Sequence, residues 1–314
     1  MTVAAFDLPM RVRFRGQERR RGIVISGPAG WGEFSPFPDY DAEVAATWLA
    51  ASREATHQGW PPPLRTRIPV NTTVPAVPAE QAHAMVAASG CSTAKVKVAE
   101  RGQALADDIA RVEAVRDALG RGGRLRVDAN AGWSLDEAVT ALTELSEFDL
   151  EYAEQPVSSL ADMAALRRKV DVPLAADESV RTAEDPLNIA GLEAADVVVL
   201  KVQPLGGVRA CLQVAEACGL PVVVSSAVET SVGLAAGLAL AGALPDLPYA
   251  CGLGTMTLID GDVCSESLVP RDGVLPVLLS APEPDLIGRA EPAPEVAAWW
   301  SRRLADAEAV LDAR

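Results

Sequence analysis

Residues 196–204 read DVVVLKVQP, four consecutive apolar residues followed by Lys201 and a short polar ending. A continuous Val/Leu run of this kind is typical of a parallel strand that is buried on both faces. Seven other β-rich segments occur between residues 69 and 255, separated by stretches that could form helices. They are residues 69–74 (PVNTTV), 93–98 (TAKVKV), 124–130 (RLRVDAN), 150–156 (LEYAEQP), 172–179 (VPLAADES), 221–228 (PVVVSSAV) and 249–255 (YACGLGT). Eight such βα units predict an α/β fold, a TIM-like (β/α) barrel with a modified last unit.

The residues on either side of this region have a different pattern. In residues 1–67, two segments (10–15 and 22–26) alternate apolar and polar residues as strands do, and residues 41–55 have helical periodicity. The three prolines at 61–63 mark a stiff break. We predict an N-terminal α+β capping domain over 1–67 and a barrel over 68–280. A doubly wound open sheet is the alternative, although no GxGxxG follows the first strand.

Composition restricts the partners. The chain has 314 residues and a net charge of −15, which argues against nucleic acid and anionic membranes. Arg15, Arg19, Arg20 and Arg21 form a basic cluster that we interpret as a solvated hairpin turn. The longest uncharged apolar run, Val232 to Leu244, is too short to cross a bilayer and predicts a buried helix. With no apolar leader at the start and an odd number of cysteines, 5, we expect reduced thiols and a cytoplasmic protein, a monomer or small homo-oligomer.

Five charged residues stand at the carboxyl ends of successive predicted strands. In chain order they are Lys97, Asp128, Glu154, Asp177 and Lys201. Function in parallel α/β folds collects at these ends. Taken singly, each has an ordinary alternative, since Asp177 could cap a helix, Asp128 could begin a turn, and Lys201 could reach solvent.

Three carboxylates on adjacent strands are hard to explain in that way. Close carboxylates cannot all stay ionised without a cation, and oxygen ligands select a hard ion such as Mg²⁺. Lys95 and Lys97 lie two residues apart and therefore point to the same side of their strand. We infer a magnesium site at which a lysine removes a proton next to a substrate carboxylate.

Five short motifs carry a family resemblance. Lys95-Val96-Lys97, Asp128-Ala129-Asn130, Glu154-Gln155-Pro156, Asp177-Glu178-Ser179 and Lys201-Val202-Gln203-Pro204 resemble the motif series of the enolase superfamily, and within it the muconate-lactonizing subgroup. The resemblance covers nearly the whole chain, and it implies that residues 281–314 return to pack on the capping domain. Enzymes of this superfamily are themselves the standard example of a Lys base that works together with Mg²⁺.

The resemblance also implies roles for single residues. Asp128, Glu154 and Asp177 become the magnesium ligands, Lys97 the general base, and Lys201 the lysine on the opposite face. Lys95, Asn130 and Glu178 become supporting groups. Arg126 has either that role or an ordinary structural ion pair.

Substrate choice depends on the last two predicted strands. Ser225, Ser226, Gly254 and Thr255 offer hydroxyl and amide donors for a second substrate carboxylate. A dipeptide epimerase of this superfamily would carry an acidic pair there, whereas this chain has no acid until Asp260. The chain most resembles the o-succinylbenzoate synthase group, which implies a syn dehydration of a small carboxylate. N-Succinylamino acid racemization, muconate-type cycloisomerization and a non-catalytic binding role are the alternatives. We expect cap contacts from residues 31–40 and near Arg53.

Overall fold

The computed structural model describes residues 2–182 and 187–314. Its N-terminal unit is an antiparallel sheet in the order β1-β2-β3 with a helix, α1, against it. The bounds are β1 Val3–Phe14, β2 Gln17–Gly27, β3 Gly30–Phe34 and α1 Ala42–His57. Helix α1 begins after Asp41, whose side chain accepts a hydrogen bond from the Val44 backbone N–H. The predicted strands and helix of the capping region are confirmed.

Seven parallel strands form the second sheet, in the order β11-β10-β9-β8-β7-β6-β5. Their bounds are β5 Thr72–Val74, β6 Thr93–Lys97, β7 Arg124–Asp128, β8 Leu150–Glu154, β9 Leu174–Ala176, β10 Val197–Leu200 and β11 Val222–Val224. The strand order follows the chain without reversal. This order excludes the doubly wound alternative, in which the order reverses at a switch point.

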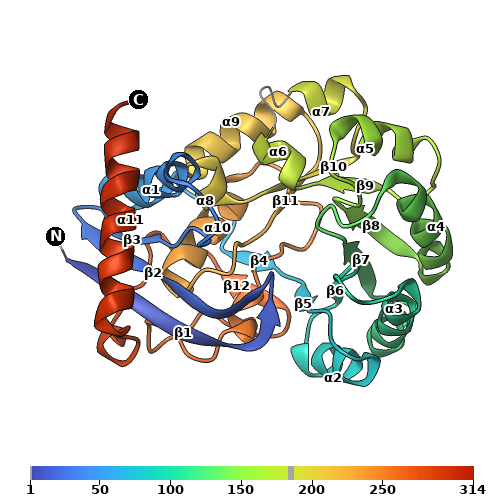
Figure 1. Cartoon of the computed structure of the whole chain (residues 1–314), viewed down its shortest axis with the longest axis horizontal. Helices are drawn as coiled ribbons and strands as arrows, with labels where there is room; N and C mark the ends of the chain where they lie inside the picture. The colour runs from blue at the N-terminus through green and yellow to red at the C-terminus, as the bar shows by residue number, and fades with distance from the viewer. Residues whose placement is uncertain (1, 183–186) are drawn as a thin grey trace.

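Helices follow the strands and cover the outside of the curled sheet, as Figure 1 shows. Their bounds are α2 Ala79–Ser89, α3 Leu105–Leu119, α4 Leu135–Leu145, α5 Leu160–Arg167, α6 Glu178–Thr182, α7 Leu187–Gly191, α8 Val202–Leu205, α9 Val208–Cys218 and α10 Ser231–Ala243. Helix α10 is the predicted buried apolar helix, and its residues from Ser231 to Gly242 are all buried. In the described residues, no helix is both long and apolar enough to cross a bilayer.

The predicted eighth strand is the part of this pattern that differs. Residues 249–255 form isolated bridges instead of a strand and lead into a short 3₁₀ helix, Thr255–Leu258. These bridges join both edges of the sheet. On the β5 side, the Cys251 N–H donates to Pro69 O (2.8 Å) and the Asn71 N–H donates to Cys251 O (2.9 Å). On the β11 side, the Gly252 N–H donates to Val224 O (2.8 Å).

The surroundings of strand β10 explain why its apolar run is continuous. Val197 and Val199 pack with Tyr152 inside the curl of the sheet, whereas Val198 and Leu200 belong to the outer core beneath the helices. Both faces are therefore buried, which removes the polar alternation seen in half-exposed strands.

The last part of the chain returns to the N-terminal unit. A small antiparallel sheet pairs β12 Val274–Pro276 with β4 Arg67–Pro69, and a 3₁₀ turn follows at Ile287–Arg289. Helix α11 Pro294–Asp312 packs against α1 and β1, at the left of Figure 1. Trp300 of α11 is buried and meets Phe34 of β3 edge-on, with ring centroids 6.1 Å apart.

Candidate active site

The five predicted charged residues lie together at one rim of the parallel sheet. Lys97, Asp128 and Glu154 are the last residues of β6, β7 and β8. Asp177 and Lys201 directly follow β9 and β10. Lys97 is in register with Asp128, and Asp128 with Glu154. The placement predicted from the sequence is what the fold produces, because parallel strands end at the same edge.

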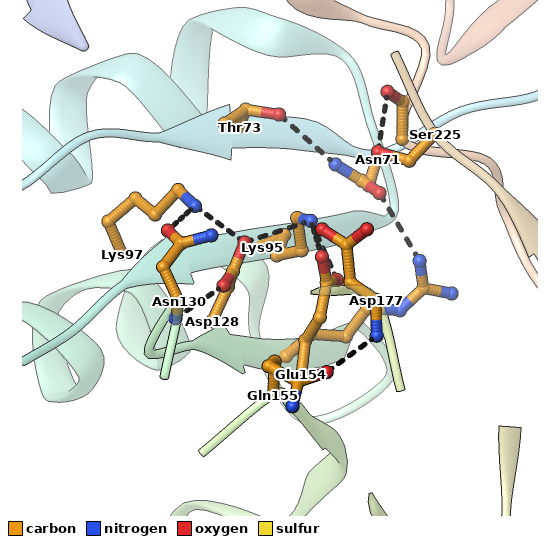
Figure 2. A network of polar contacts seen from close by, with 12 residues as sticks. Asn71, Thr73, Lys95, Lys97, Asp128, Asn130, Glu154, Gln155, Asp177 and Ser225 are labelled. Atoms are coloured by element: carbon orange, nitrogen blue, oxygen red, sulfur yellow. Dashed lines mark hydrogen bonds and ion pairs between the residues drawn. The ribbon is translucent and has the colours of Figure 1, made fainter. Parts of the chain in front are cut away.

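Each carboxylate of the rim is hydrogen-bonded to a lysine, and Figure 2 shows the bonds made by Lys95 and Lys97. Lys95 Nζ donates to both oxygens of Glu154, at 2.8 and 2.7 Å, and lies 3.2 Å from Asp128 Oδ2. Lys97 Nζ donates to the same Asp128 oxygen at 2.6 Å. Lys201 Nζ bonds Asp177 Oδ2. All three carboxylates are buried, with exposed fractions of 1% or less.

Burial and neighbouring charges shift the pKa values of these groups in different directions. Burial raises the pKa of Glu154 to about 7, and the neighbouring charge of Asp128 adds to the rise. Burial also acts on Asp128, but Lys97 and Lys95 outweigh it and hold the pKa of Asp128 well below its usual range. Lys95 keeps a raised pKa because Glu154 and Asp128 outweigh its burial. The rim is therefore a charged network in which Glu154 is the carboxylate closest to protonation at neutral pH.

The donor set of the rim fits a hard divalent cation. Three carboxylates from adjacent strands supply oxygen ligands only. Asp177 Oδ1 accepts no hydrogen bond from another described residue, although Arg181 Nη2 lies 3.2 Å away. Within residues 2–182 and 187–314, no three His, Cys, Asp or Glu side chains are already grouped as metal ligands. The lysine ammonium groups are hydrogen-bonded to the carboxylate oxygens that would coordinate a metal ion. An ion therefore binds only if these ammonium groups move.

Two of the predicted supporting residues link neighbouring strands. Asn130 accepts a hydrogen bond from Lys97 Nζ and donates through Nδ2 to Glu178 Oε1 at 3.1 Å. Its backbone N–H donates to Asp128 Oδ1 at 3.0 Å, so Asp128 also makes the turn contact that is the ordinary role of such a residue. Glu178 in turn lies 3.2 Å from Arg181 Nη2.

Two further residues of the rim were missed in the sequence, although they belong to the motifs or follow them directly. Gln155 is buried, and its Oε1 accepts from the backbone N–H groups of Asp177 and Ser179 at 3.0 and 3.1 Å. Arg181 pairs with both Asp177 and Glu178. The sequence contained a signal for each of them. Gln155 stands in the Gln-Pro ending of the motif that begins at Glu154, and Arg181 lies four residues after Asp177.

Arg126 lies deeper inside the curl of the sheet than Asp128. It donates to Glu151 Oε2 (2.6 Å), to Ala250 O (2.7 Å) and to Asn71 Oδ1 (3.2 Å), and it stacks over Tyr152. These contacts connect β7 to the segment that joins the two sheet edges. Of the two alternatives for Arg126, they correspond to the structural ion pair.

The predicted substrate-binding residues lie beside a small cavity of about 30 Å³. Its lining includes Lys97, Lys201, Asp128, Thr255 and residues 225–228. The hydroxyl groups of Ser226 and Thr255 are 2.5 Å apart. Gly254 is buried against Asn71 O, which a Cβ at this position would approach to 2.7 Å. Pockets that bind small molecules usually measure about 300–1,000 Å³, so a substrate enters this cavity only if the surrounding side chains move.

The capping region closes this cavity from above. Phe14, Arg15 and Phe37 contribute to its lining, and Lys97 Nζ lies 5.2 Å from the centre of the Phe14 ring. Phe37 falls in the predicted range 31–40, whereas Arg53 lies elsewhere and pairs with Asp312 of α11. The expected cap contact near Arg53 stays a prediction. A larger cavity of about 500 Å³ lies on the α3 and α4 side and contains none of the predicted residues.

Known families match both parts of the chain. Residues 78–286 match the family described as enolase C-terminal domain-like, and residues 5–56 match enolase N-terminal domain-like. Among solved structures, muconate lactonizing enzyme from Pseudomonas fluorescens in complex with muconolactone superposes with a TM-score of 0.76 at 24% identity, covering 95% of this chain and 97% of that one. N-Succinyl Arg/Lys racemase from Bacillus cereus has a TM-score of 0.76 at 21% identity, with coverage of 93% and 97%. Likeness at this level of identity concerns the fold.

Curated relatives are more similar. An o-succinylbenzoate synthase of Thermobifida fusca is 59% identical over 312 residues, which cover 99% of this chain and 98% of the relative. An o-succinylbenzoate synthase of Mycobacterium tuberculosis is 51% identical over 299 residues, with coverage of 95% and 90%. The fold and the charged rim thus define an enolase-type protein, a class whose members generally use a divalent metal. More narrowly, the chain belongs to the o-succinylbenzoate synthase family of the enolase superfamily.

Proposed function

We propose that this protein is an o-succinylbenzoate synthase of menaquinone biosynthesis. The reaction is the syn dehydration of 2-succinyl-6-hydroxy-2,4-cyclohexadiene-1-carboxylate to 2-succinylbenzoate. The observation that carries the proposal is the rim itself, in which Lys97 and Lys201 are bonded to different carboxylates, Asp128 and Asp177. Near-full-length identity of 51–59% to relatives of that name supports the choice of substrate.

The residues of the rim have separate roles in this proposal. Lys97 takes the proton from C1 of the ring, and the same ammonium group then protonates the hydroxide that leaves C6. Lys201 stabilises the negative charge from the other side, and Lys95 holds Glu154 and Asp128 in place. Asp128, Glu154 and Asp177 would hold Mg²⁺, which would stabilise the charge that develops on the substrate carboxylate. Asn130 and Glu178 orient Lys97 and the rim.

The charges of the rim favour an anionic substrate. Three lysines pair with the three carboxylates without any metal. Even with Lys97 neutral, as a base must be, an added divalent cation leaves the site with excess positive charge, which an anionic substrate would balance. We place the second carboxylate, at the end of the succinyl chain, beside Ser225, Ser226 and Thr255, which line the cavity, and near Gly254, which precedes Thr255.

The test follows the loss of diene absorbance when purified protein and Mg²⁺ are added to the cyclohexadiene substrate. We expect a magnesium-dependent loss that is absent with EDTA and in Lys97→Ala. Lys169→Ala, which changes an exposed lysine, is the matched control. If the protein binds Mg²⁺ but leaves the diene unchanged, the synthase assignment is wrong and the family assignment stands.

N-Succinylamino acid racemization is the second candidate. The presence of a lysine at each side of the cavity favours it, because racemization needs one base on each face of the reacting carbon. Deuterium exchange of N-succinylamino acids in heavy water measures it directly. Exchange without dehydration would replace the first proposal with this one.

The remaining assignments are also proposals. We place the domain boundary near residue 67, treat residues 68–280 as a (β/α) barrel whose eighth position is taken by residues 249–255, and regard 281–314 as part of the cap. The five cysteines, four of which are buried, form no disulfide within the described residues, which agrees with a reducing cytoplasm. A small-molecule carboxylate is the only partner that the proposed reaction requires, and we propose a monomer or small homo-oligomer.

A further inference from the structure

A buried polar cluster joins the capping sheet to the loop that follows β11. Arg20, Glu33 and Ser35 come from the cap, and their exposed fractions are 2%, 2% and 0%. They face residues 227–233, which form the end of the loop after β11 and the first turn of helix α10. The sequence had suggested that Arg20 belongs to a solvated turn, and this is wrong, because the turn lies at residues 15–16 and Arg20 is inside β2.

Arg20 binds the backbone of this loop. Its Nε donates to Val228 O at 2.7 Å, and its Nη2 lies 3.4 Å from Ala227 O. The same Nη2 donates to Ser35 O and Ser35 Oγ at 2.6 and 2.7 Å, which fixes the guanidinium within the cap. Hydrogen bonds from a charged donor are among the stronger ones in proteins.

Glu33 holds the other end of the loop. Its Oε2 accepts from the backbone N–H groups of Thr230 and Gly233, both at 3.1 Å, and from the Thr230 hydroxyl. Its Oε1 accepts from Ser35 Oγ at 2.6 Å, so Arg20 and Glu33 share Ser35. A carboxylate at the start of α10 is also favoured by the helix dipole.

Between these two attachments the loop is strained. Val228 has a φ of 65°, in the left-handed region that a β-branched residue rarely adopts. It lines the cavity together with Ser225, Ser226 and Ala227, and its N–H donates to Ser226 Oγ at 3.1 Å. Such a conformation persists only where surrounding contacts impose it. The contact on the Val228 carbonyl is Arg20.

We propose that Arg20, supported by Glu33, is a positioning residue that holds the strained Val228 backbone and so places the Ser226 hydroxyl for the succinyl carboxylate. This inference rests on the proposed function. In that function the carboxylate at the reacting end of the substrate would lie toward Asp128, Glu154 and Asp177, and none of these three residues belongs to this loop. Loss of Arg20 therefore weakens binding of the succinyl chain more than it slows the chemical step.

The test compares Arg20→Met with Arg19→Met, a matched control on the same strand whose side chain is 44% exposed and pairs with Asp7. In the synthase assay we expect KM to rise about tenfold in Arg20→Met, with kcat changed by less than about threefold, because the charge-assisted hydrogen bond to the strained Val228 is lost. Arg19→Met should keep the wild-type KM. Binding of the product 2-succinylbenzoate should weaken to a similar degree, whereas 2-butanoylbenzoate, which lacks the terminal carboxylate, should bind both proteins equally.

A second substitution separates positioning from general destabilisation. Glycine adopts the left-handed conformation without strain, so in a Val228→Gly background the loop no longer needs Arg20. We expect Arg20→Met to raise KM less than about threefold in that background, by comparison with Val228→Gly alone. An equal rise in both backgrounds, or an unchanged KM in folded Arg20→Met, would overturn the proposal.

Two controls keep these outcomes readable. If Arg20→Met does not fold, Arg20→Lys replaces it, because lysine keeps the charge but cannot contact Val228 O and Ser35 together, and KM should again rise. A wild-type protein that fails to dehydrate the substrate contradicts the proposed function. If Arg20→Met weakens the binding of 2-succinylbenzoate and of 2-butanoylbenzoate equally, the positioning role of Arg20 is wrong and the proposed function stands.

Discussion

Lys95 donates to both carboxylate oxygens of Glu154, at 2.8 and 2.7 Å, and neither side chain is more than 7% exposed. The lysine also lies 3.2 Å from Asp128, so one buried ammonium group stands between two of the proposed metal ligands. This ammonium group occupies the space between the two carboxylates and neutralises their charge, so a bound metal ion would compete with it on both counts.

Replacing this lysine should therefore reveal the competition between ammonium and metal. We expect Lys95→Met to lower the free energy of unfolding by about 3 kcal/mol in EDTA, because it leaves the buried Glu154 carboxylate without its lysine partner. Saturating Mg²⁺ should recover most of this loss, since the ion supplies the missing positive charge. Chemical denaturation with and without Mg²⁺ measures both values, with Lys169→Met as the control. An equal loss in both conditions would argue against a metal between these carboxylates.

Removal of one proposed ligand should weaken the metal. Asp177→Asn keeps the size of the side chain but removes the charge that Lys201 and Arg181 contact. We expect Mg²⁺ affinity to fall at least about tenfold, because even groups that only orient metal ligands contribute about 10- to 100-fold. Titration calorimetry with Mg²⁺ alone measures this, and the exposed Asp171→Asn is the control. Unchanged affinity would remove Asp177 from the ligand set.

The two lysines on either side of the cavity should differ in their effects. Lys97→Ala should lower kcat for the dehydration about a thousandfold, the range expected when a general acid–base group is lost. Lys201→Ala should lower it less, because the proposed role of Lys201 is to stabilise charge. Steady-state rates at saturating Mg²⁺ give the comparison. Equal losses would instead indicate that both lysines transfer protons, as in racemization.

The stability of the cap–barrel contact should depend on pH through Glu33. Burial raises the pKa of Glu33 to about 7, against contrary effects of Arg20, Ser35 and Thr230, while Glu229 adds to the rise. A carboxyl group with a raised pKa in the folded protein stabilises the fold below its unfolded value, 4.5, and this contribution is lost as the pH rises through 7.

Glu33→Gln should remove that dependence. Between pH 4.5 and pH 8 the free energy of unfolding of the wild type should fall by about 3 kcal/mol relative to the variant. Urea denaturation at several pH values measures the difference, and the exposed Glu18→Gln is the control. A constant difference between wild type and Glu33→Gln would contradict a raised pKa in the folded protein.

The repeating βα order and the five charged residues at the strand ends follow from the amino-acid sequence alone. These features are local, because a strand's direction fixes which residue comes last and parallel strands end at one edge. For example, the sequence patterns of residues 93–98 and 124–130 are enough to place Lys97 and Asp128 at the ends of their strands.

Which charged side chains pair with one another depends on how the strands and the cap pack. Lys95 of β6 pairs with Glu154 of β8, and Arg126 of β7 donates a hydrogen bond to Ala250 O in the segment that joins the sheet edges. The curl of the sheet sets both distances. The eighth segment makes bridges instead of a strand, with two paired residues, Cys251 and Gly252. Arg20 is the clearest case, since its sequence neighbours Arg19 and Arg21 are half-exposed while it is buried. Strand alternation predicts that Arg20 faces away from its neighbours, but only the packing of the cap on the loop before α10 makes that face an interior one.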